Sequence, residues 1–266
     1  MNIIVCVKQV PDPETPPKGF QVDQVAKRVI PPLGAALVIN PFDENAVEAA
    51  LRFKDAYGGN VTALTMGPPS AEDVLRHAMA MGVDEGVLIE NPAPDNLDSF
   101  ATAYCLAGAI KKMGTVDLIV CGREAADWNA GQVGPGIAEL LKLPSVTLVK
   151  NIALVDKGLT VERVIPDGFE VVELTLPALL TVTNELGNPR YPTVRGVMEA
   201  KKKEITLLRL PDLGIDELEL SNMSQRLQLR DLFIPVYERK CHLFKANTLE
   251  EAAISMAHKL IELKPS

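Results

Sequence analysis

The sequence has few aromatic residues, few histidines and no long hydrophobic run. Its 266 residues include 7 Phe, 4 Tyr, 1 Trp and 3 His. No stretch of about 18 consecutive apolar residues occurs, so we expect no membrane insertion. A basic surplus is also missing, because 27 Lys and Arg face 35 Asp and Glu and give a formal net charge of −8. We therefore expect no nucleic-acid partner.

Common catalytic and metal-binding motifs are absent as well. The four cysteines are too far apart for a CxxC pair, and the histidines do not have a metal-binding spacing. The sequence contains no Walker A loop and no GxSxG elbow. We therefore predict no metal site and no catalytic residue. The chain opens directly on an apolar strand rather than on a signal peptide, which predicts a reducing, cytoplasmic location.

The first 150 residues alternate short apolar runs with amphipathic helical patterns. The runs and patterns predict strands at 3–7, 61–66, 86–89, 118–121 and 146–149, and helices at about 43–57, 70–81, 99–113 and 134–142. Strands that alternate with helices form an open, mainly parallel sheet flanked by helices. The predicted fold class is therefore α/β.

The pattern changes after residue 150. Residues 159–164 and 169–174 flank a turn signal and predict an antiparallel hairpin, and 178–183 predicts one more strand. We assign residues 1–205 to the α/β domain and 206–266 to a C-terminal arm. The arm is expected to end in an amphipathic helix capped by Thr248, and such a helix needs a surface on which to pack.

A glycine-rich segment at residues 121–136 is the first candidate binding site. It follows a predicted strand and precedes a helix expected to begin near Pro135. Ligands of open parallel sheets bind beyond the carboxyl ends of the strands, and helix N-termini attract phosphate. The spacing of Gly131, Gly134 and Gly136 does not match GxGxxG, so a plain strand-to-helix connection is the alternative.

Two more segments lie where predicted strands end or helices begin. In the run from Asn40 to Asp43, Asn40 is expected to cap a helix and Asp43 to fall in its first turn. The run from Thr65 to Pro68, which includes Met66 and Gly67, lies where another predicted strand ends. These segments would meet the glycine-rich loop in one crevice if their strands are neighbours in the sheet.

Taken in this order, the segments resemble the beta subunit of electron transfer flavoprotein over about residues 2–215. The similar blocks are residues 7–12, 40–48, 67–68, 80–84, 122–135, 188–193, 198–203 and 212–215. The resemblance implies a heterodimer with an alpha subunit that carries the redox-active FAD. It implies that residues 1–205 bind a nucleotide and that the dimer shuttles electrons between dehydrogenases and acceptors. The end of the arm lies beyond the resemblance, and we expect it to pack on the alpha subunit.

The resemblance also implies which residues bind the nucleotide. They lie at the ends of the first strands, at the start of the first helix and in the glycine-rich loop. They are Cys6, Lys8, Asn40, Phe42, Asp43, Met66, Gly122, Arg123, Ala126, Asp127, Gly131, Gln132, Val133 and Gly134. Asp127 and Gln132 are the leading side-chain contacts.

The identity of the nucleotide depends on the same loop. Ordinary members of the family bind AMP, whereas electron-bifurcating members bind a second FAD, with NADH as electron donor. The run from Gln132 to Pro135 is similar to the bifurcating form, but residues 127–131 depart from its usual Asp-Gly-Asp-Thr-Ala run. We predict FAD and keep AMP as the alternative. A stand-alone regulator that binds adenine nucleotides is a further alternative.

Residues 184–203 resemble the segment with which the family docks onto flavin-dependent dehydrogenases. Val194 falls at the position of the apolar anchor residue, commonly leucine. Tyr191, Arg195 and Met198 complete the predicted partner-binding set. For Lys201–Lys203 two interpretations stay open, a role in steering acidic partners and a plain solvated surface.

Overall fold

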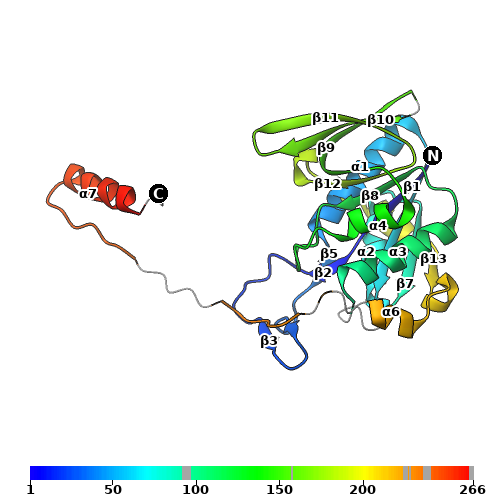
Figure 1. Cartoon of the computed structure of the whole chain (residues 1–266), viewed down its shortest axis with the longest axis horizontal. Coiled ribbons are helices and arrows are strands. Elements are labelled where there is room, and N and C mark those ends of the chain that lie inside the picture. The colour runs from blue at the N-terminus through cyan, green and yellow to red at the C-terminus, as the bar shows by residue number, and fades with distance from the viewer. Residues whose placement is uncertain (92–96, 157, 224–226, 228, 236–240, 264–266) are drawn as a thin grey trace. The chain divides into compact units, whose positions relative to one another are not determined.

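The computed structural model describes residues 1–91, 97–156, 158–223, 227, 229–235 and 241–263. The chain divides into two compact units, Met1–Leu232 and Phe233–Ser266 (Figure 1). The first unit holds all the described strands, and the second holds one described helix.

A nine-stranded sheet forms the centre of the first unit, in the order β11-β10-β9-β12-β8-β1-β6-β7-β13. Neighbours from β9 to β13 in this order are parallel, whereas β10 is antiparallel to both β9 and β11. This arrangement confirms the predicted α/β fold with its antiparallel hairpin. The strands are β1 (Asn2–Cys6), β6 (Asn60–Gly67), β7 (Glu85–Glu90), β8 (Leu118–Gly122), β9 (Ser145–Val155), β10 (Gly158–Ile165), β11 (Gly168–Thr175), β12 (Ala178–Val182) and β13 (Ile205–Leu208).

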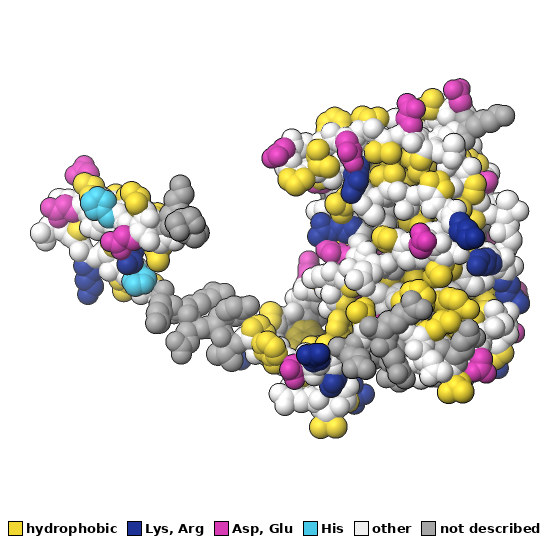
Figure 2. All heavy atoms as spheres, viewed as in Figure 1, with side chains coloured by type: hydrophobic (Ala, Val, Ile, Leu, Met, Phe, Trp, Pro, Cys, Tyr) yellow, Lys and Arg dark blue, Asp and Glu magenta, His cyan; other side chains and the backbone are white. Residues whose placement is uncertain are grey.

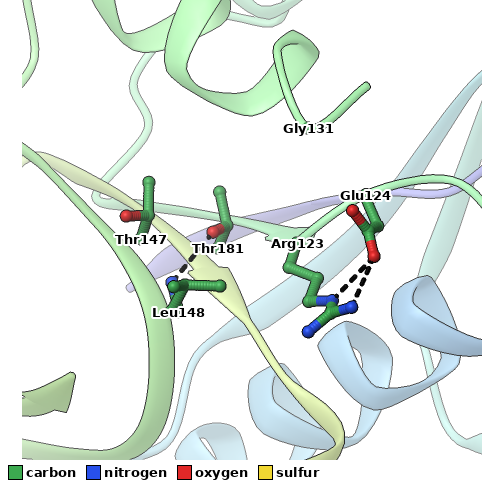
Figure 3. A pocket seen from close by; sticks show the side chains of 6 residues that line it. All are labelled: Arg123, Glu124, Gly131, Thr147, Leu148 and Thr181. Carbon is green, nitrogen blue, oxygen red and sulfur yellow. Dashed lines mark hydrogen bonds and ion pairs between the residues drawn. The ribbon is translucent and has the colours of Figure 1, made fainter. Parts of the chain in front are cut away.

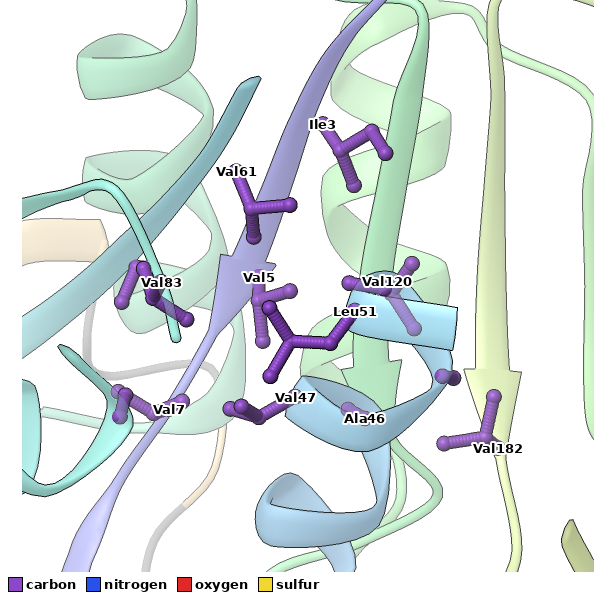
Figure 4. Packing of buried hydrophobic residues seen from close by; sticks show 14 of the residues in the cluster. Ile3, Val5, Val7, Ala46, Val47, Leu51, Val61, Val83, Val120 and Val182 are labelled. Carbon is purple, nitrogen blue, oxygen red and sulfur yellow. The ribbon is translucent and has the colours of Figure 1, made fainter. Parts of the chain in front are cut away.

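Helices cover both faces of the parallel part. They are α1 (Pro41–Tyr57), α2 (Glu72–Met81), α3 (Ser99–Met113) and α4 (Val133–Leu141), whereas α5 (Val194–Ala200) packs on α2 and α6 (Glu217–Met223) packs on α3. Short 3-10 turns lie at Pro69–Ala71, Asn184–Leu186 and Leu210–Leu213. Successive strand residues point to opposite faces, so Val5 of β1 packs with Leu51 of α1, as Figure 4 shows, while Ile4 packs with α3 and α4. Two apolar cores result, one on each face.

The compact unit extends beyond residue 205, where the sequence placed the domain boundary. β13 pairs with β7 at the sheet edge, and Leu208, Leu210 and Leu220 are buried in the same core as α3. The short run of β13 is interrupted by Thr206 and is only partly buried, so no strand was predicted there. Two short antiparallel pairs were also not predicted, namely β2 (Gln9–Pro11) with β5 (Leu37–Ile39) and β3 (Gln21–Asp23) with β4 (Arg28–Ile30).

The second unit contains α7 (Leu249–Glu262). Thr248 caps it as expected, because its Oγ1 accepts a hydrogen bond of 3.2 Å from the Glu251 N–H. No residue of α7 is buried, and Ile254, Met256 and Leu260 are exposed. The packing of this helix on an alpha subunit therefore stays a prediction. Among the described residues, no helix is long and apolar enough to cross a bilayer.

Exposed apolar side chains also gather over the hairpin. Val155, Phe169 and Val171 are exposed on β9 and β11, and Figure 2 shows hydrophobic side chains on this part of the surface. Lys150 covers one of them, since its Nζ lies 3.8 Å from the centre of the Phe169 ring.

Candidate functional site

The ends of three neighbouring strands bring the predicted site residues together. β1 lies between β6 and β8, and all three are parallel. Lys8, Met66 and Arg123 therefore lie together at the carboxyl ends of these central strands, close to the start of α1. The convergence that the sequence predicted only conditionally is thus realised.

Asn40 holds the glycine-rich loop rather than the helix. It occupies the N-cap position of α1, but its side chain makes no capping hydrogen bond. Its Nδ2 instead donates to the Glu124 carbonyl at 2.8 Å, and its Oδ1 accepts from the Ala126 N–H at 3.0 Å. The predicted capping role of the Asn40 side chain was wrong, because the buried amide satisfies two backbone groups of a distant loop.

Asp43 joins two strand ends to α1. It lies in the first turn, as predicted, and its carboxylate is buried. Oδ2 accepts from the Lys8 N–H at 2.8 Å, and Oδ1 accepts from the Gly122 N–H at 3.1 Å. Burial raises the pKa of Asp43 to about 7, although hydrogen bonds from Asn40, Lys8 and Gly122 oppose the rise. Asp43 thus fixes the ends of β1 and β8 relative to the start of α1.

Replacing Asp43 by asparagine is expected to change how stability depends on pH. The carboxyl pKa is higher in the folded chain than in the unfolded chain, so the folded state binds more protons between about pH 4 and pH 7. Stability contributed by Asp43 therefore falls as the pH rises through this window. Urea unfolding is measured for the parent and for Asp43→Asn from pH 8 down to pH 5. Below pH 7, the free energy of unfolding of the parent should rise relative to that of the variant by up to about 1.4 kcal/mol per pH unit. Parallel pH profiles would contradict this assignment.

The charged side chains of the loop form ion pairs, one of them with Lys8 after β1. The Lys8 Nζ lies 2.6 Å from Asp127 Oδ2, which joins β1 to the loop. Arg123 pairs with Glu124 and stacks over the Phe42 ring, with its Cζ 4.6 Å from the ring centre. Within the predicted set, Asp127 is therefore engaged by Lys8 rather than free.

A cavity of about 360 Å³ lies beside this loop (Figure 3). It is lined by Arg123, Glu124, Gly131, Thr147, Leu148 and Thr181. Gly131 directly precedes Gln132, the exposed N-cap residue of α4, so the cavity lies at the N-terminal end of that helix. Helix N-termini present unpaired N–H groups and partial positive charge to anions.

The far wall of the cavity was not predicted. Leu148 adopts a left-handed backbone conformation with φ +59°, and its N–H donates to Thr181 Oγ1 at 3.2 Å. The pairing of β9 with β12 shifts register here, as at a β-bulge. Bulges and strained residues concentrate near binding sites. Only a polar Thr181 within an apolar strand could have drawn attention to this wall.

Pro135 lies further into its helix than expected, and Gly134 has a packing role that the sequence did not indicate. α4 begins at Val133, so Pro135 is its third residue rather than its first. Proline is tolerated there because the first four N–H groups of a helix lack intrahelical acceptors. A Cβ on Gly134 would lie 2.8 Å from Thr181 Cγ2, so this glycine permits close packing of α4 on β12.

Cys6 and Cys121 are buried register partners on β1 and β8. A hydrogen bond with Cys6, together with burial, raises the pKa of the Cys121 thiol well above its ordinary value. The thiolate is the nucleophilic form of cysteine, so this shift makes Cys121 a poor nucleophile. Within the described ranges, no group of three or more His, Cys, Asp or Glu residues is placed to hold a metal ion.

The predicted docking residues form a separate exposed surface. Tyr191 is 93% exposed and Val194 is 81% exposed, and Met198 is exposed as well. Thr193 caps α5 by accepting from the Gly196 N–H at 3.0 Å, and the exposed Arg195 pairs with Glu199 one turn further on. We call residues 188–200 the docking segment.

Comparisons with known proteins agree with this arrangement. The electron transfer flavoprotein domain family matches residues 29–213. The chain is 40% identical to an electron transfer flavoprotein subunit beta from Thermoanaerobacterium thermosaccharolyticum, over 98% of each chain. It is also 40% identical, over 98% of each chain, to a caffeyl-CoA reductase-Etf complex subunit from Acetobacterium woodii.

A third relative is the acryloyl-CoA reductase electron transfer subunit gamma from Anaerotignum propionicum, 42% identical over 78% of this chain and 77% of the relative. The family match and the near full-length relatives agree with the parallel sheet and the loop before α4. The chain therefore belongs to the electron transfer flavoprotein family, as a relative of its beta subunits.

Proposed function

We propose that this chain is the beta subunit of a heterodimer that carries electrons between a flavin-dependent dehydrogenase and an acceptor, and that its crevice binds FAD. The observation that carries the proposal is the cavity at the N-terminal end of α4, beside a loop that Asn40 holds and strand ends that Asp43 joins. AMP is the alternative occupant. Two relatives are named as electron transfer subunits or complex subunits of CoA-ester reductases, which supports a dehydrogenase-type partner.

The residues around the cavity fit a nucleotide. The N-terminal N–H groups of α4 suit a phosphate, while Arg123 and the hydroxyls of Thr147 and Thr181 suit phosphate or ribose oxygens. Lys8 and Asp127 would close the crevice over the bound group. A bound FAD would supply hydride and single-electron chemistry, with NADH as a donor. The protein residues would bind, orient and shield it.

Counting bound nucleotides tests this proposal. The chain is co-expressed with its alpha subunit, the heterodimer is purified, and the released nucleotides are separated and quantified. Two FAD per heterodimer are expected. One FAD with one AMP would instead support a non-bifurcating carrier. A monomeric chain with adenine nucleotide but no flavin would support the stand-alone regulator.

The cellular location also remains a proposal. Cys6, Cys105, Cys121 and Cys241 are all free thiols. Free thiols are typical of a reducing compartment, so we place the chain in the cytoplasm.

A further inference from the structure

The buried carboxylate of Glu48 on α1 binds Arg190, which lies near the start of the docking segment. The Glu48 side chain is only 5% exposed. Its Oε2 accepts from the Arg190 N–H at 3.1 Å and from Arg190 Nε at 2.8 Å, and its Oε1 accepts from Arg52 Nε at 2.7 Å. Burial acts to raise the pKa of Glu48, but the hydrogen bonds from Arg190 and Arg52 outweigh it and lower the pKa. The group is therefore a buried anion between two cations.

The same two arginines bind the chain around the segment. Arg52 donates to the carbonyls of Leu186 at 2.8 Å and of Asn188 at 3.2 Å. Arg190 also pairs with Asp55 at 2.8 Å. Arg52 and Arg190, which both bind Glu48, thus hold residues 186–190 against α1. The exposed Tyr191 follows directly.

The other end of the docking segment is fixed to different elements. Arg76 of α2 donates to the Ala200 carbonyl at 2.6 Å. Lys203 Nζ donates to the carbonyls of Val83 at 2.8 Å and Asp84 at 2.9 Å. The segment is consequently held at both ends while its apolar side chains face solvent. A surface fixed before binding loses less conformational entropy on association.

We propose that Glu48 is the positioning residue of the docking segment, setting Tyr191 and Val194 in the geometry that a dehydrogenase recognises. The N-cap residue of α1, Asn40, binds the glycine-rich loop, and Asp43 in its first turn binds the end of β8 at Gly122. One helix thereby fixes the docking surface relative to the crevice. This inference rests on the proposed docking function.

Glu48→Gln in the full heterodimer is the test. The variant keeps the volume but removes the charge that orients Arg190 and Arg52. In steady-state assays with a dehydrogenase, KM for the heterodimer should rise about tenfold, while kcat at saturation and nucleotide content stay within twofold of the parent. Asp55→Asn is the matched control, because Asp55 touches the same arginine from a 60% exposed position. It should change KM by less than twofold.

Arg190→Gln provides a second route if Glu48→Gln does not assemble. It leaves Glu48 paired with Arg52 and should raise KM in the same way. A KM within twofold of the parent in a folded Glu48 or Arg190 variant would overturn the inference. Its failure is distinguishable from failure of docking itself. If Val194→Asp impairs transfer and Glu48→Gln does not, only the inference fails, whereas an inert Val194→Asp removes the docking function.

Discussion

Replacing Gly122 by alanine is expected to destabilise the compact unit by about 3 kcal/mol and to abolish the nucleotide binding proposed for its crevice. A Cβ at this position would lie 2.4 Å from Asp43 Oδ1 and 2.7 Å from the Phe42 carbonyl carbon. Neither the helix backbone nor the buried carboxylate can retreat, because Asp43 also accepts from Lys8. The end of β8 would have to move away from α1, and the loop that begins at Arg123 would move with it.

Thermal unfolding and nucleotide content of the purified heterodimer measure both effects. Gly108→Ala is the matched control, since its Cβ would lie 3.4 Å from Ile215 Cδ1, the end of a flexible side chain. Gly108 lies within α3, where alanine favours the helix by up to about 1 kcal/mol. A Gly122→Ala heterodimer with normal stability and full nucleotide content would contradict the role given to the close contact between β8 and α1.

Replacing Val194 by aspartate is expected to slow electron transfer with a dehydrogenase by roughly 30-fold, equivalent to about 2 kcal/mol at a binding hot spot. Val194 is the first residue of α5 and is among the most exposed apolar side chains. An aspartate there would bury an unpaired charge in the complex, although it suits the N-terminus of the isolated helix. The folded chain should therefore lose none of its stability.

The control is Val171→Asp, an equivalent change at an exposed site on β11. Assembly with the alpha subunit and flavin content are measured for both variants, and transfer rates are compared at equal flavin concentration. Equal loss of flavin and transfer in Val194→Asp would mean that the docking segment is structural.

The strands of the parallel sheet other than β13, and the helices α1 to α4, were predictable because their patterns are local. Apolar runs such as residues 118–121 and the periodic stretch of α1 carry their own signal. Asn40 and Asp43 were chosen for helix capping, and the structure keeps them at the site for another reason. Their side chains bind residues 79 to 86 positions away in Gly122, Glu124 and Ala126, or, for Asp43, the strand end at Lys8.

The rest of the site depends on contacts that no local pattern encodes. Leu148 and Thr181 meet only because β9 and β12 are neighbours with a shifted register. Glu48 and Arg190 are separated by 142 positions. In the sequence, Glu48 has the pattern of a charged residue on a helix surface, and Arg190 has that of a charged residue in a loop. Only the fold brings the two together as an ion pair with a buried carboxylate. Pairings of this kind follow from topology.

The position of β12 has a consequence for synthesis of the chain. β12 lies between β8 and β9, although both precede it in the sequence. A nascent chain therefore presents the apolar edge of β8 from the time residue 122 emerges until residue 182 follows, about 60 residues and roughly 3–12 s later. Open strand edges pair readily with other chains. Ribosomes that translate neighbouring copies on one message would bring such edges together, so this interval favours chaperone capture of the nascent chain.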